Sequence, residues 1–448
     1  MTTVHWFRRD LRLSDNPALL EAVRRAGDDG VVGLFVVDPV LWRSASPRLD
    51  YLAASLRALD DSLGGRLVVR TGVAADVVPR IAAEVQATSV HVTAATEPYG
   101  RARDDAVARA LARFATETEL VATGSPYAVA PGRLRTAAGT PFQVFTPFRR
   151  AWLDHGWALP AARPQPATWL TLASDGVPAA PATDVQLPAA GERAALDRWR
   201  RFVDDGLADY ATDRDRPAIE GTSAMSAPLK FGEVHPRTLL SALADDDGSR
   251  TYRSELAWRE FHADVLWHAP DATHRSLRAV VPDDAWVGGD DWFDAWRDGR
   301  TGYPLVDAGM RQLRATGWMH NRVRMVVASF LVKDLHIRWQ RGARHFMAWL
   351  VDGDVAQNQL NWQWVAGTGR DAAPYFRVFN PVLQGEKFDP DGSYVRRWVP
   401  ELRAVPGVAV HQPWRLDPAA APDYPARIVD HAVERAVTLE AYGAQRGV

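Results

Sequence analysis

Residues 4–37 read VHWFRRDLRLSDNPALLEAVRRAGDDGVVGLFVV. The apolar runs Val4–Phe7 and Val31–Val37 have the length and the β-branched content of buried strands. Between them Pro17–Arg25 has the pattern of a helix, and the acidic and amide residues before Pro17 can start it, because proline fits the first helical turn. A strand, a helix and a strand in this order predict a parallel β–α–β unit.

The same alternation continues to about residue 125, so we expect a doubly wound parallel sheet with helices on both faces, an α/β fold. No G-x-G-x-x-G sequence follows the first strand, which argues against ordinary dinucleotide binding there. The further strands are predicted at Arg66–Arg70, Ser89–Thr93 and Glu119–Ala122, and the further helices at Leu49–Leu63, Ala74–Val85 and Arg101–Ala115.

Proline marks a break in this pattern. Residues 160–190 contain prolines at positions 160, 164, 166, 178, 181 and 188, which is typical of a linker. After about residue 193 the pattern is mostly helical. We therefore predict an α/β domain over 1–125, an interdomain linker over 126–192 and a mostly α-helical domain over 193–448.

Composition narrows the class of protein. Of its 448 residues 47% are hydrophobic and 24% charged, which is ordinary for a globular protein. No run of eighteen apolar residues predicts a membrane span, and the N-terminus lacks a signal-peptide core, so we expect a cytoplasmic location. The absence of cysteine excludes disulfides, thiolate metal sites and cysteine nucleophiles, and we expect no metal. The net charge of −2 does not itself indicate nucleic-acid binding, although a local basic groove stays open.

Two later stretches carry unusual polar stripes. Residues 318–325 read WMHNRVRM, and Asn321 and Met325 are four positions apart. Asp354, Asn358 and Trp362 have the same spacing, so each set shares one face of a helix. A structural helix would place Leu, Ile and Val on such a face. The stripes instead predict the walls of a pocket for a large, flat molecule with polar edges.

These stretches, with several others in the same order, resemble the photolyase–cryptochrome family, and within it the class I photolyases that repair cyclobutane pyrimidine dimers. The resemblance runs nearly from end to end. It implies an antenna-chromophore domain at the N-terminus and a helical domain that binds FAD. Blue light would then drive electron transfer from reduced FAD to a dimer flipped out of UV-damaged DNA. The stretches that carry it are His5–Asn16, Gly221–Ser226, Ser254–Phe261, Thr301–Asp307, Trp318–Met325, Asp352–Trp364, Asp371–Arg377 and Phe379–Pro381.

The flavin site can be placed on this basis. Hydroxyls just before a helical segment suit phosphate oxygens, although a simple helix cap is the alternative. The resemblance puts Arg324 and Asp352 beside the ring, where a purely structural ion pair is the alternative. It puts Asn358 opposite flavin N5, where an amide can hydrogen-bond several protonation states. The residues expected to bind FAD are Tyr210, Thr222, Ser223, Ala224, Met225, Ser226, Arg259, Arg324, Asp352, Asp354 and Asn358.

The lesion site follows from the same resemblance. Glu255 would hydrogen-bond the polar edge of the thymines, while Trp258 and Trp364 would sandwich the dimer by stacking. Asn321 stands where the related branch that repairs (6-4) photoproducts has a second histidine, which favours the cyclobutane lesion. Arginine contacts to the backbone would position the DNA without reading its sequence, with a solvated surface as the alternative. The expected contacts are Arg214, Glu255, Trp258, Asn321, Arg322, Met325, Trp364 and Arg377.

Three tryptophans match the family's electron-transfer chain, which photoreduces oxidised FAD: Trp362, Trp339 and Trp286. Their spacing in the sequence does not establish that they are close in space. With Glu255 and Asn321 they are the predicted catalytic residues.

The antenna site differs from that of folate-binding members, which carry an Asn-Glu pair after the fourth strand. Here Glu97-Pro-Tyr-Gly-Arg101 resembles members that use 8-hydroxy-5-deazaflavin, and Arg48 and Lys230 stand where that subtype has contacts. An ordinary turn and a surface lysine are the alternative. FMN, folate or an empty site also stay open.

Two other classes of function are the alternatives to repair. A cryptochrome-like photoreceptor would signal without repair; the retained lesion residues argue against it, and the end at Val448 predicts no long regulatory tail. A light-independent flavin oxidoreductase finds no support, because the chain lacks a dinucleotide fingerprint. The resemblance implies a monomer that acts on damaged DNA, with no membrane and no obligate protein partner.

Overall fold

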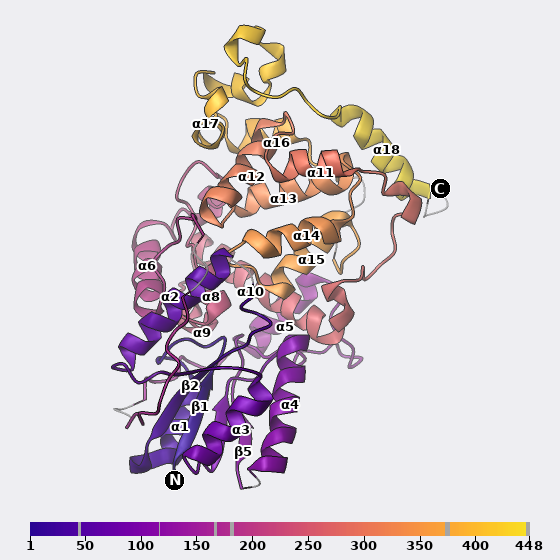
Figure 1. Cartoon of the computed structure of the whole chain (residues 1–448). Coiled ribbons are helices and arrows are strands. Elements are labelled where there is room, and N and C mark those ends of the chain that lie inside the picture. Colours follow the sequence, from indigo (N-terminus) through magenta and orange to yellow (C-terminus); the bar gives the residue numbers. More distant parts are fainter. Residues whose placement is uncertain (44–45, 116, 165–167, 180–182, 372–376, 445–448) are drawn as a thin grey trace. The chain divides into compact units, whose positions relative to one another are not determined.

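The computed structural model describes residues 1–43, 46–115, 117–164, 168–179, 183–371 and 377–444 (Figure 1). The chain forms two compact units. Unit 1 comprises Met1–Thr183, Leu187–Ala208 and Ser223–Pro270, and unit 2 comprises Asp184–Gln186, Asp209–Thr222 and Asp271–Val448. The domain boundaries proposed from the sequence, near 125 and 192, stay a prediction.

Unit 1 is built on a parallel sheet of five strands in the order β3-β2-β1-β4-β5. In the register of the central strand, Thr3 lies opposite Val31 on one side and Ser89 on the other. The predicted α/β sheet is therefore confirmed. Its strands are β1 (Thr3–Phe7), β2 (Val31–Val37), β3 (Val68–Thr71), β4 (Ser89–Val92) and β5 (Glu119–Ala122).

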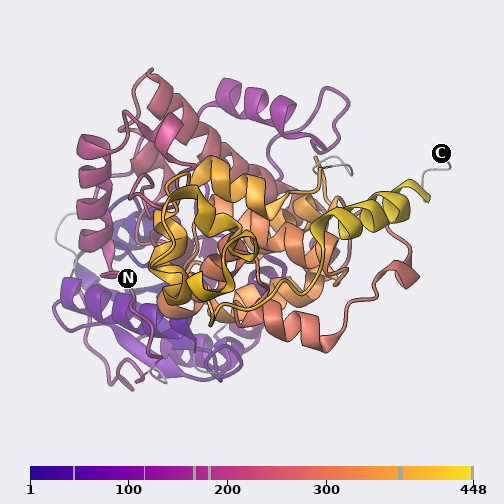
Figure 2. The ribbon, with the colours of Figure 1, turned by 90° about the horizontal axis from the view of Figure 1, so that it is seen from above.

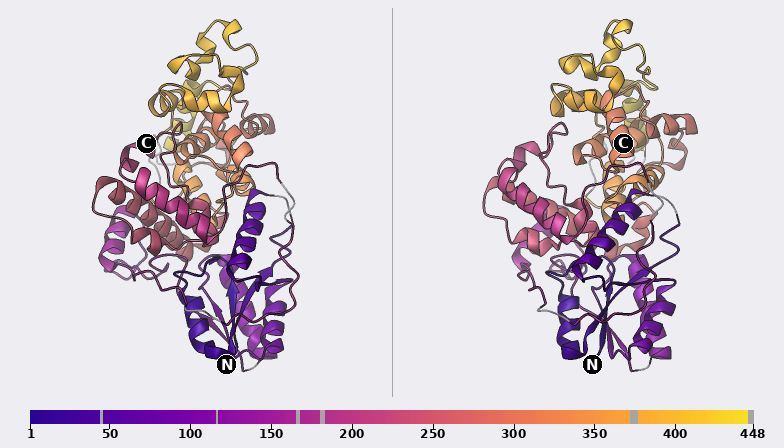
Figure 3. Two further views of the ribbon diagram at one scale, coloured as in Figure 1. Left: turned by 90° about the vertical axis from the view of Figure 1, so that its left-hand side faces the viewer. Right: turned by 60° about the vertical axis from the view of Figure 1, so that its left-hand side comes forward.

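Helices cover both faces of this sheet, as Figure 3 shows. Side chains alternate along a strand, so Val4 and Trp6 enter the core that α3 and α4 close. On the other face Thr3 Oγ1 donates to the Ala22 carbonyl of α1, 3.1 Å away. Asn16 starts α1 as predicted, accepting a hydrogen bond from Leu19 N at 3.1 Å. The helices among the strands are α1 (Pro17–Ala26), α2 (Pro47–Ser62), α3 (Ala74–Glu84) and α4 (Pro98–Phe114), with a 3₁₀ turn at Gly27–Asp29.

The rest of unit 1 is helical, and one of its helices lies in the segment predicted as a linker. This is α5 (Phe145–His155), whose Phe145, Phe148 and Trp152 are buried on one face. Positions 145, 148 and 152 share a helix face, which packs against α10. Residues 165–167 and 180–182 of the predicted linker lie outside the described residues. The other helices are α6 (Glu192–Asp205), α8 (Ser226–Phe231), α9 (Pro236–Leu240) and α10 (Asp247–His268).

Unit 2 is helical, in agreement with the predicted fold class. Its apolar core contains Trp296, Phe330, Trp339 and Trp362. The C-terminal helix α18 is the yellow helix beside the C label in Figure 2. The helices are α7 (Tyr210–Asp213), α11 (Asp290–Arg297), α12 (Pro304–Thr316), α13 (Asn321–Ser329), the π-helical η4 (Phe330–Asp334), α14 (Trp339–Trp349), α15 (Val355–Ala366), α16 (Pro381–Phe388), α17 (Ser393–Trp398) and α18 (His431–Ala444).

Short 3₁₀ turns complete the described chain after α10. They are Pro270–Thr273, Asp283–Ala285, Pro400–Leu402, Gly407–His411, Pro413–Arg415 and Pro418–Ala420. Among the described residues, none of the helices is both long enough and apolar enough to cross a membrane.

Candidate functional site

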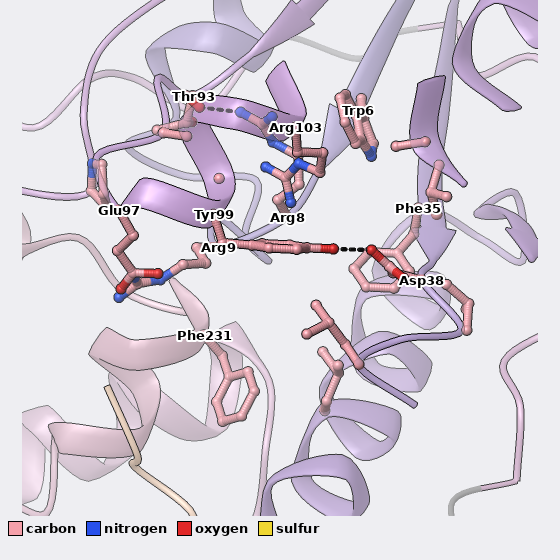
Figure 4. A pocket seen from close by; sticks show the side chains of 18 of the residues that line it. Trp6, Arg8, Arg9, Phe35, Asp38, Thr93, Glu97, Tyr99, Arg103 and Phe231 are labelled. Carbon is pink, nitrogen blue, oxygen red and sulfur yellow. Dashed lines mark hydrogen bonds and ion pairs between the residues drawn. The ribbon is translucent and has the colours of Figure 1, made fainter. Parts of the chain in front are cut away.

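A cavity of about 230 Å³ opens in unit 1 where β1, β2 and β4 end. The strand order reverses between β1 and β4, and open parallel sheets bind ligands at such a point. Figure 4 shows the cavity from close by. Trp6, Phe35, Tyr99 and Phe231 are among the rings that line it.

Charged groups surround these rings. The guanidinium carbons of Arg8 and Arg103 lie 4.6 and 4.9 Å from the centre of the Trp6 ring. Burial lowers the pKa of Arg8 to about 10, so it stays cationic at neutral pH. The Tyr99 hydroxyl donates to Asp38, and burial together with that carboxylate raises the tyrosine pKa to about 12 (Figure 4). Asp104 forms ion pairs with both Arg8 and Arg103, at 2.5 and 3.0 Å. The cavity therefore suits a flat ligand with polar edges.

Two of the three residues predicted for the antenna line this cavity. Glu97 does so and pairs with Arg9, and Lys230 does so from α8. Arg48 is on α2 next to the lining residue Leu49. Sequence reasoning missed the other lining residues, because they come from several strand ends that only the folded sheet brings together.

The segment before α8 has an unusual backbone. Ala224 has a φ of 51°, in the left-handed region that favours glycine. The Ser223 hydroxyl lies 2.9 Å from that of Tyr252 and also accepts from Met225 N at 3.3 Å. Backbone strain of this kind is common where a protein clamps a ligand. Ser226, the first residue of α8, is exposed.

The lesion residues of unit 1 lie along α10. Glu255 is half-buried, and Trp258, one turn later, is half-buried and stacks on Phe145 of α5. Arg259 donates to the backbone oxygens of Pro126 and Leu229, at 3.2 and 3.3 Å. These contacts give Arg259 a structural task, and its predicted contact with FAD stays a prediction.

In unit 2, Arg324 and Asp352 form the predicted pair. Arg324 Nη2 donates to Asp352 Oδ2 at 2.8 Å, and its Nε donates to the Met319 carbonyl at 2.7 Å. The Asp352 side chain is only 3% exposed. Its other oxygen, Oδ1, is buried and has no hydrogen-bond partner among the described residues. A buried acceptor is costly to leave unpaired, so this oxygen fits a donor on a bound molecule, such as a flavin ring N–H.

The polar stripe of α15 is present as predicted. Asp354 caps the helix, accepting a hydrogen bond from Gln357 N at 3.1 Å. Asn358 is buried one turn later, and its amide nitrogen lies 3.0 Å from the Ala343 carbonyl of α14. Trp362, the next residue of this stripe, is buried, and Trp364, two positions later, is half-buried.

Basic residues gather around a second cavity, of about 650 Å³, in unit 2. Arg322 and Met325 of α13 and Arg377 line it, as three of the predicted DNA contacts. Arg322 donates to Asp215 at 2.7 Å and lies over the Phe388 ring, 4.3 Å from its centre. Sequence reasoning missed the further cations of this cavity, which are Arg216 and Lys387.

The structure also describes the remaining predicted FAD and DNA contacts of unit 2. Asn321 begins α13 and is exposed. Tyr210 is buried in α7 with the Arg214 guanidinium 5.6 Å from its ring centre, and Thr222 is half-buried. Residues 372–376 of the stretch Asp371–Arg377 lie outside the described residues.

The three tryptophans of the predicted chain occupy different environments. Trp362 contacts the rings of Phe346 and Trp296, with centres 5.0 and 6.2 Å apart. Trp339 is buried, and its Nε1 donates to Ser276 Oγ at 3.0 Å. Trp286 is half-buried. Sequence reasoning missed Trp296, since its contact with Trp362 joins residues far apart in the chain.

No cluster of three or more His, Asp or Glu side chains that could hold a metal ion occurs in the described parts of the chain.

Comparison with known proteins covers almost the whole chain. A family model described as the FAD binding domain of DNA photolyase matches residues 252–444, and one described as DNA photolyase matches residues 3–167. The deoxyribodipyrimidine photo-lyase of Streptomyces griseus is 44% identical over an alignment of 449 residues, which covers 96% of this chain and 96% of that protein. A crystal structure of a bacterial class III photolyase from Agrobacterium tumefaciens has a TM-score of 0.90 and 38% identity, covering 100% of this chain and 98% of that one. An archaeal photolyase from Sulfolobus tokodaii, solved with two FAD molecules, has a TM-score of 0.87 and 31% identity, covering 99% and 100%.

Proposed function

Because this chain belongs to the DNA photolyase family, we propose that it repairs cyclobutane pyrimidine dimers in UV-damaged DNA, with light-excited reduced FAD as the electron donor. The observation that carries the proposal is the surface of α13, whose first residue, Asn321, stands where the (6-4) branch has a second histidine and so favours the cyclobutane dimer. This helix presents Asn321 and Met325 one turn apart, and Arg322 between them lines the basic cavity. One short helix thus offers base contacts and a phosphate contact together.

The buried carboxylate Asp352 supports FAD as the cofactor. Arg324 holds one of its oxygens and the other has spare hydrogen-bonding capacity. Bound in its reduced form, FAD supplies an electron donor that blue light excites. The proposed task of Asp352, Arg324 and Asn358 is to orient the ring. That of Thr222, Ser223 and Ser226 is to bind its phosphates.

The proposed lesion residues have separate tasks. Glu255 hydrogen-bonds the polar edge of the thymines and so stabilises negative charge on the dimer. Trp258 and Trp364 stack on its rings, which suits any flat base. Arg214, Arg322 and Arg377 contact phosphates and position the strand. Trp362, Trp339 and Trp286 would carry electrons to oxidised FAD, a process separate from repair.

The cavity at the sheet edge is the proposed antenna site. Its cations and flat rings fit 8-hydroxy-5-deazaflavin. The Sulfolobus tokodaii photolyase was solved with two FAD molecules, which makes a second flavin the competing occupant. We assign this task to the N-terminal domain, 1–125, with Lys230 and Phe231 of α8 completing the cavity, and FAD and lesion binding to 193–448. Class I stays our assignment, although the Agrobacterium neighbour is a class III photolyase.

The direct test uses an oligonucleotide with one thymine dimer and chemically reduced protein, under blue light and in darkness. We expect restored thymines in the light alone, counted by chromatography. Glu255→Gln should lower the repair yield while the protein keeps its FAD. A parallel (6-4) oligonucleotide should stay unrepaired. No repair of the dimer, with reduced FAD and bound DNA both verified, would contradict the proposal and favour a photoreceptor.

A further inference from the structure

We propose that Phe145 of α5 is a positioning residue for dimer binding, because its ring backs Trp258 and fixes the plane on which a base stacks. The inference rests on the proposed function, in which Trp258 contacts the dimer. Helix α5, in the segment 126–192 that was predicted as a linker, would then contribute to recognition of the lesion.

The two rings form a tight stack within unit 1. Their centres are 3.7 Å apart and their planes differ by 9°. Aromatic pairs ordinarily prefer offset or edge-to-face arrangements with centres at least about 4.5 Å apart. A face-to-face pair at this distance is therefore imposed by its surroundings and not by the attraction of the rings alone.

The surroundings that impose it are the contacts between α5 and α10. Phe148 packs on Phe261 with ring centres 5.3 Å apart. Trp152 Nε1 donates to Glu260 Oε2 at 2.5 Å. The same carboxylate accepts the backbone N–H of Ala128 at 2.5 Å and of Val129 at 3.0 Å. Phe148 and Trp152 lie one and two turns after Phe145, so their contacts anchor its helix.

Two further rings of α10 lie beside the stack. His262 is tilted towards the Trp258 indole, with ring centres 5.6 Å apart. Phe261 meets both members of the stack edge-on, with its centre 6.0 Å from Phe145 and 5.8 Å from Trp258. Phe145 is 8% exposed, whereas Trp258 is half-buried. Packing thus fixes Phe145, which in turn restrains the indole that solvent reaches.

This arrangement has a consequence for binding. Phe145 occupies one face of the indole, so a base can stack only on the opposite face. An indole already held in its binding orientation loses less side-chain entropy when the base arrives. Loss of the backing ring should therefore weaken binding of the dimer while leaving phosphate contacts elsewhere unchanged.

The test compares Phe145→Leu with Phe148→Leu in the FAD-loaded full-length protein. Both residues are buried on α5, but only Phe145 stacks on Trp258. We expect Phe145→Leu to weaken binding of a thymine-dimer oligonucleotide by about 2- to 10-fold, the size of one aromatic pair. Affinity for the undamaged oligonucleotide and the FAD content should not change. Phe145→Tyr should keep wild-type binding. Phe148→Leu, which loosens the anchor of α5 but keeps the stacked ring, should lower thermal stability and weaken dimer binding clearly less than Phe145→Leu does.

Wild-type dimer affinity in Phe145→Leu would overturn the inference, as would an equal loss in Phe148→Leu. If Phe145→Leu does not fold, Phe145→Met removes the ring with less change in volume and is judged by the same criteria. A wild-type protein with no preference for dimer-containing DNA would instead contradict the proposed function, and this inference with it. The two failures are thus told apart by the wild-type measurement alone.

Discussion

At the scale of single residues, the clearest sign of a bound cofactor is the unpaired oxygen of Asp352. We predict that Asp352→Asn weakens FAD binding roughly 10-fold or more, because the change removes the charge facing Arg324 and places a donor where a donor should bind. Flavin absorbance per protein during titration of the apoprotein measures this. Asp246→Asn, at the cap of α10, is the matched control and should bind FAD normally. Equal affinity in Asp352→Asn would contradict the assignment.

Trp286 is the residue on which the proposed electron chain is easiest to test. Its ring is half-buried, with the Arg338 guanidinium 5.8 Å from its centre. A phenyl ring is much harder to oxidise than an indole. We therefore expect Trp286→Phe to slow photoreduction of oxidised flavin by an order of magnitude or more, followed by its visible spectrum under blue light. Repair by chemically reduced enzyme should be unchanged.

Trp398 offers a matched control for this experiment. It is also half-buried in unit 2, and an arginine, Arg397, lies 5.3 Å from its ring centre. Trp398→Phe should photoreduce like the wild type. If Trp286→Phe and Trp398→Phe behaved alike, Trp286 would not belong to the chain.

Sequence patterns located polar residues on helix faces but not their partners. The spacing of Asp354 and Asn358 predicted a stripe, and α15 carries it. The stack of Phe145 on Trp258 had no such signal, because 113 positions separate the two rings and only tertiary packing joins them. The same holds for Tyr99 and Asp38 in the sheet-edge cavity.

At the scale of elements, the packing of α14 on α15 depends on a glycine. A Cβ on Gly342 would lie 2.2 Å from Trp362 Cη2 and 2.5 Å from Leu331 Cδ2. We predict that Gly342→Ala lowers the free energy of unfolding by about 1–3 kcal/mol, although alanine is the better helix former. Photoreduction should also change, since Trp362 has to move. Chemical denaturation and flavin spectroscopy measure the two effects.

The matched control for this change is Gly443→Ala in α18. A Cβ there would meet nothing within 4 Å, so only helix propensity acts. It should raise the free energy of unfolding by up to about 1 kcal/mol. A lower free energy of unfolding in Gly342→Ala and a higher one in Gly443→Ala would support the packing of α14 on α15 that the structure has. Stabilisation by Gly342→Ala would contradict that packing.

Strands and helices with strong periodicity were predictable within a few residues. The runs Val31–Val37 and Glu119–Ala122 coincide with β2 and β5. Helix α5 was hidden because it lies in a segment read as a linker and is followed by prolines. Its apolar face becomes visible only against α10.

At the scale of the whole molecule, the alternation of strand and helix patterns predicted the fold class, and the order of motifs predicted the family. The sequence could not predict which charged groups would be paired or buried, because both depend on the complete fold. Arg322 and Asp215 are 107 positions apart yet form an ion pair of 2.7 Å. Buried histidines are a further example, and they determine how the protein should respond to acid.

Two buried histidines, His91 and His320, and the half-buried His345 should make the folded protein sensitive to moderate acid. Burial lowers the pKa of His91, His320 and His345 to about 4 in each case. In the unfolded chain an imidazole has a pKa of about 6.5 and binds a proton first. The stability that each neutral histidine contributes is therefore fully present above about pH 6.5 and is lost as the pH falls towards 4. Each adds a slope of up to about 1.4 kcal/mol per pH unit in that window.

Some buried carboxylates act in the opposite direction, so the prediction is best tested by difference. Burial raises the pKa of Asp334 to about 6, and the stability from that group is lost as the pH rises through this value. We predict that His345→Phe flattens the fall of unfolding free energy in acid by about one histidine's slope, roughly 1.4 kcal/mol per pH unit. His345 lies among the rings of Phe293 and Trp296, so a phenyl ring suits its place. Denaturant titrations between about pH 4 and 6.5 measure this slope. The control is His155→Phe, because His155 is exposed. An unchanged slope in His345→Phe would mean that this imidazole takes up its proton while the protein is still folded.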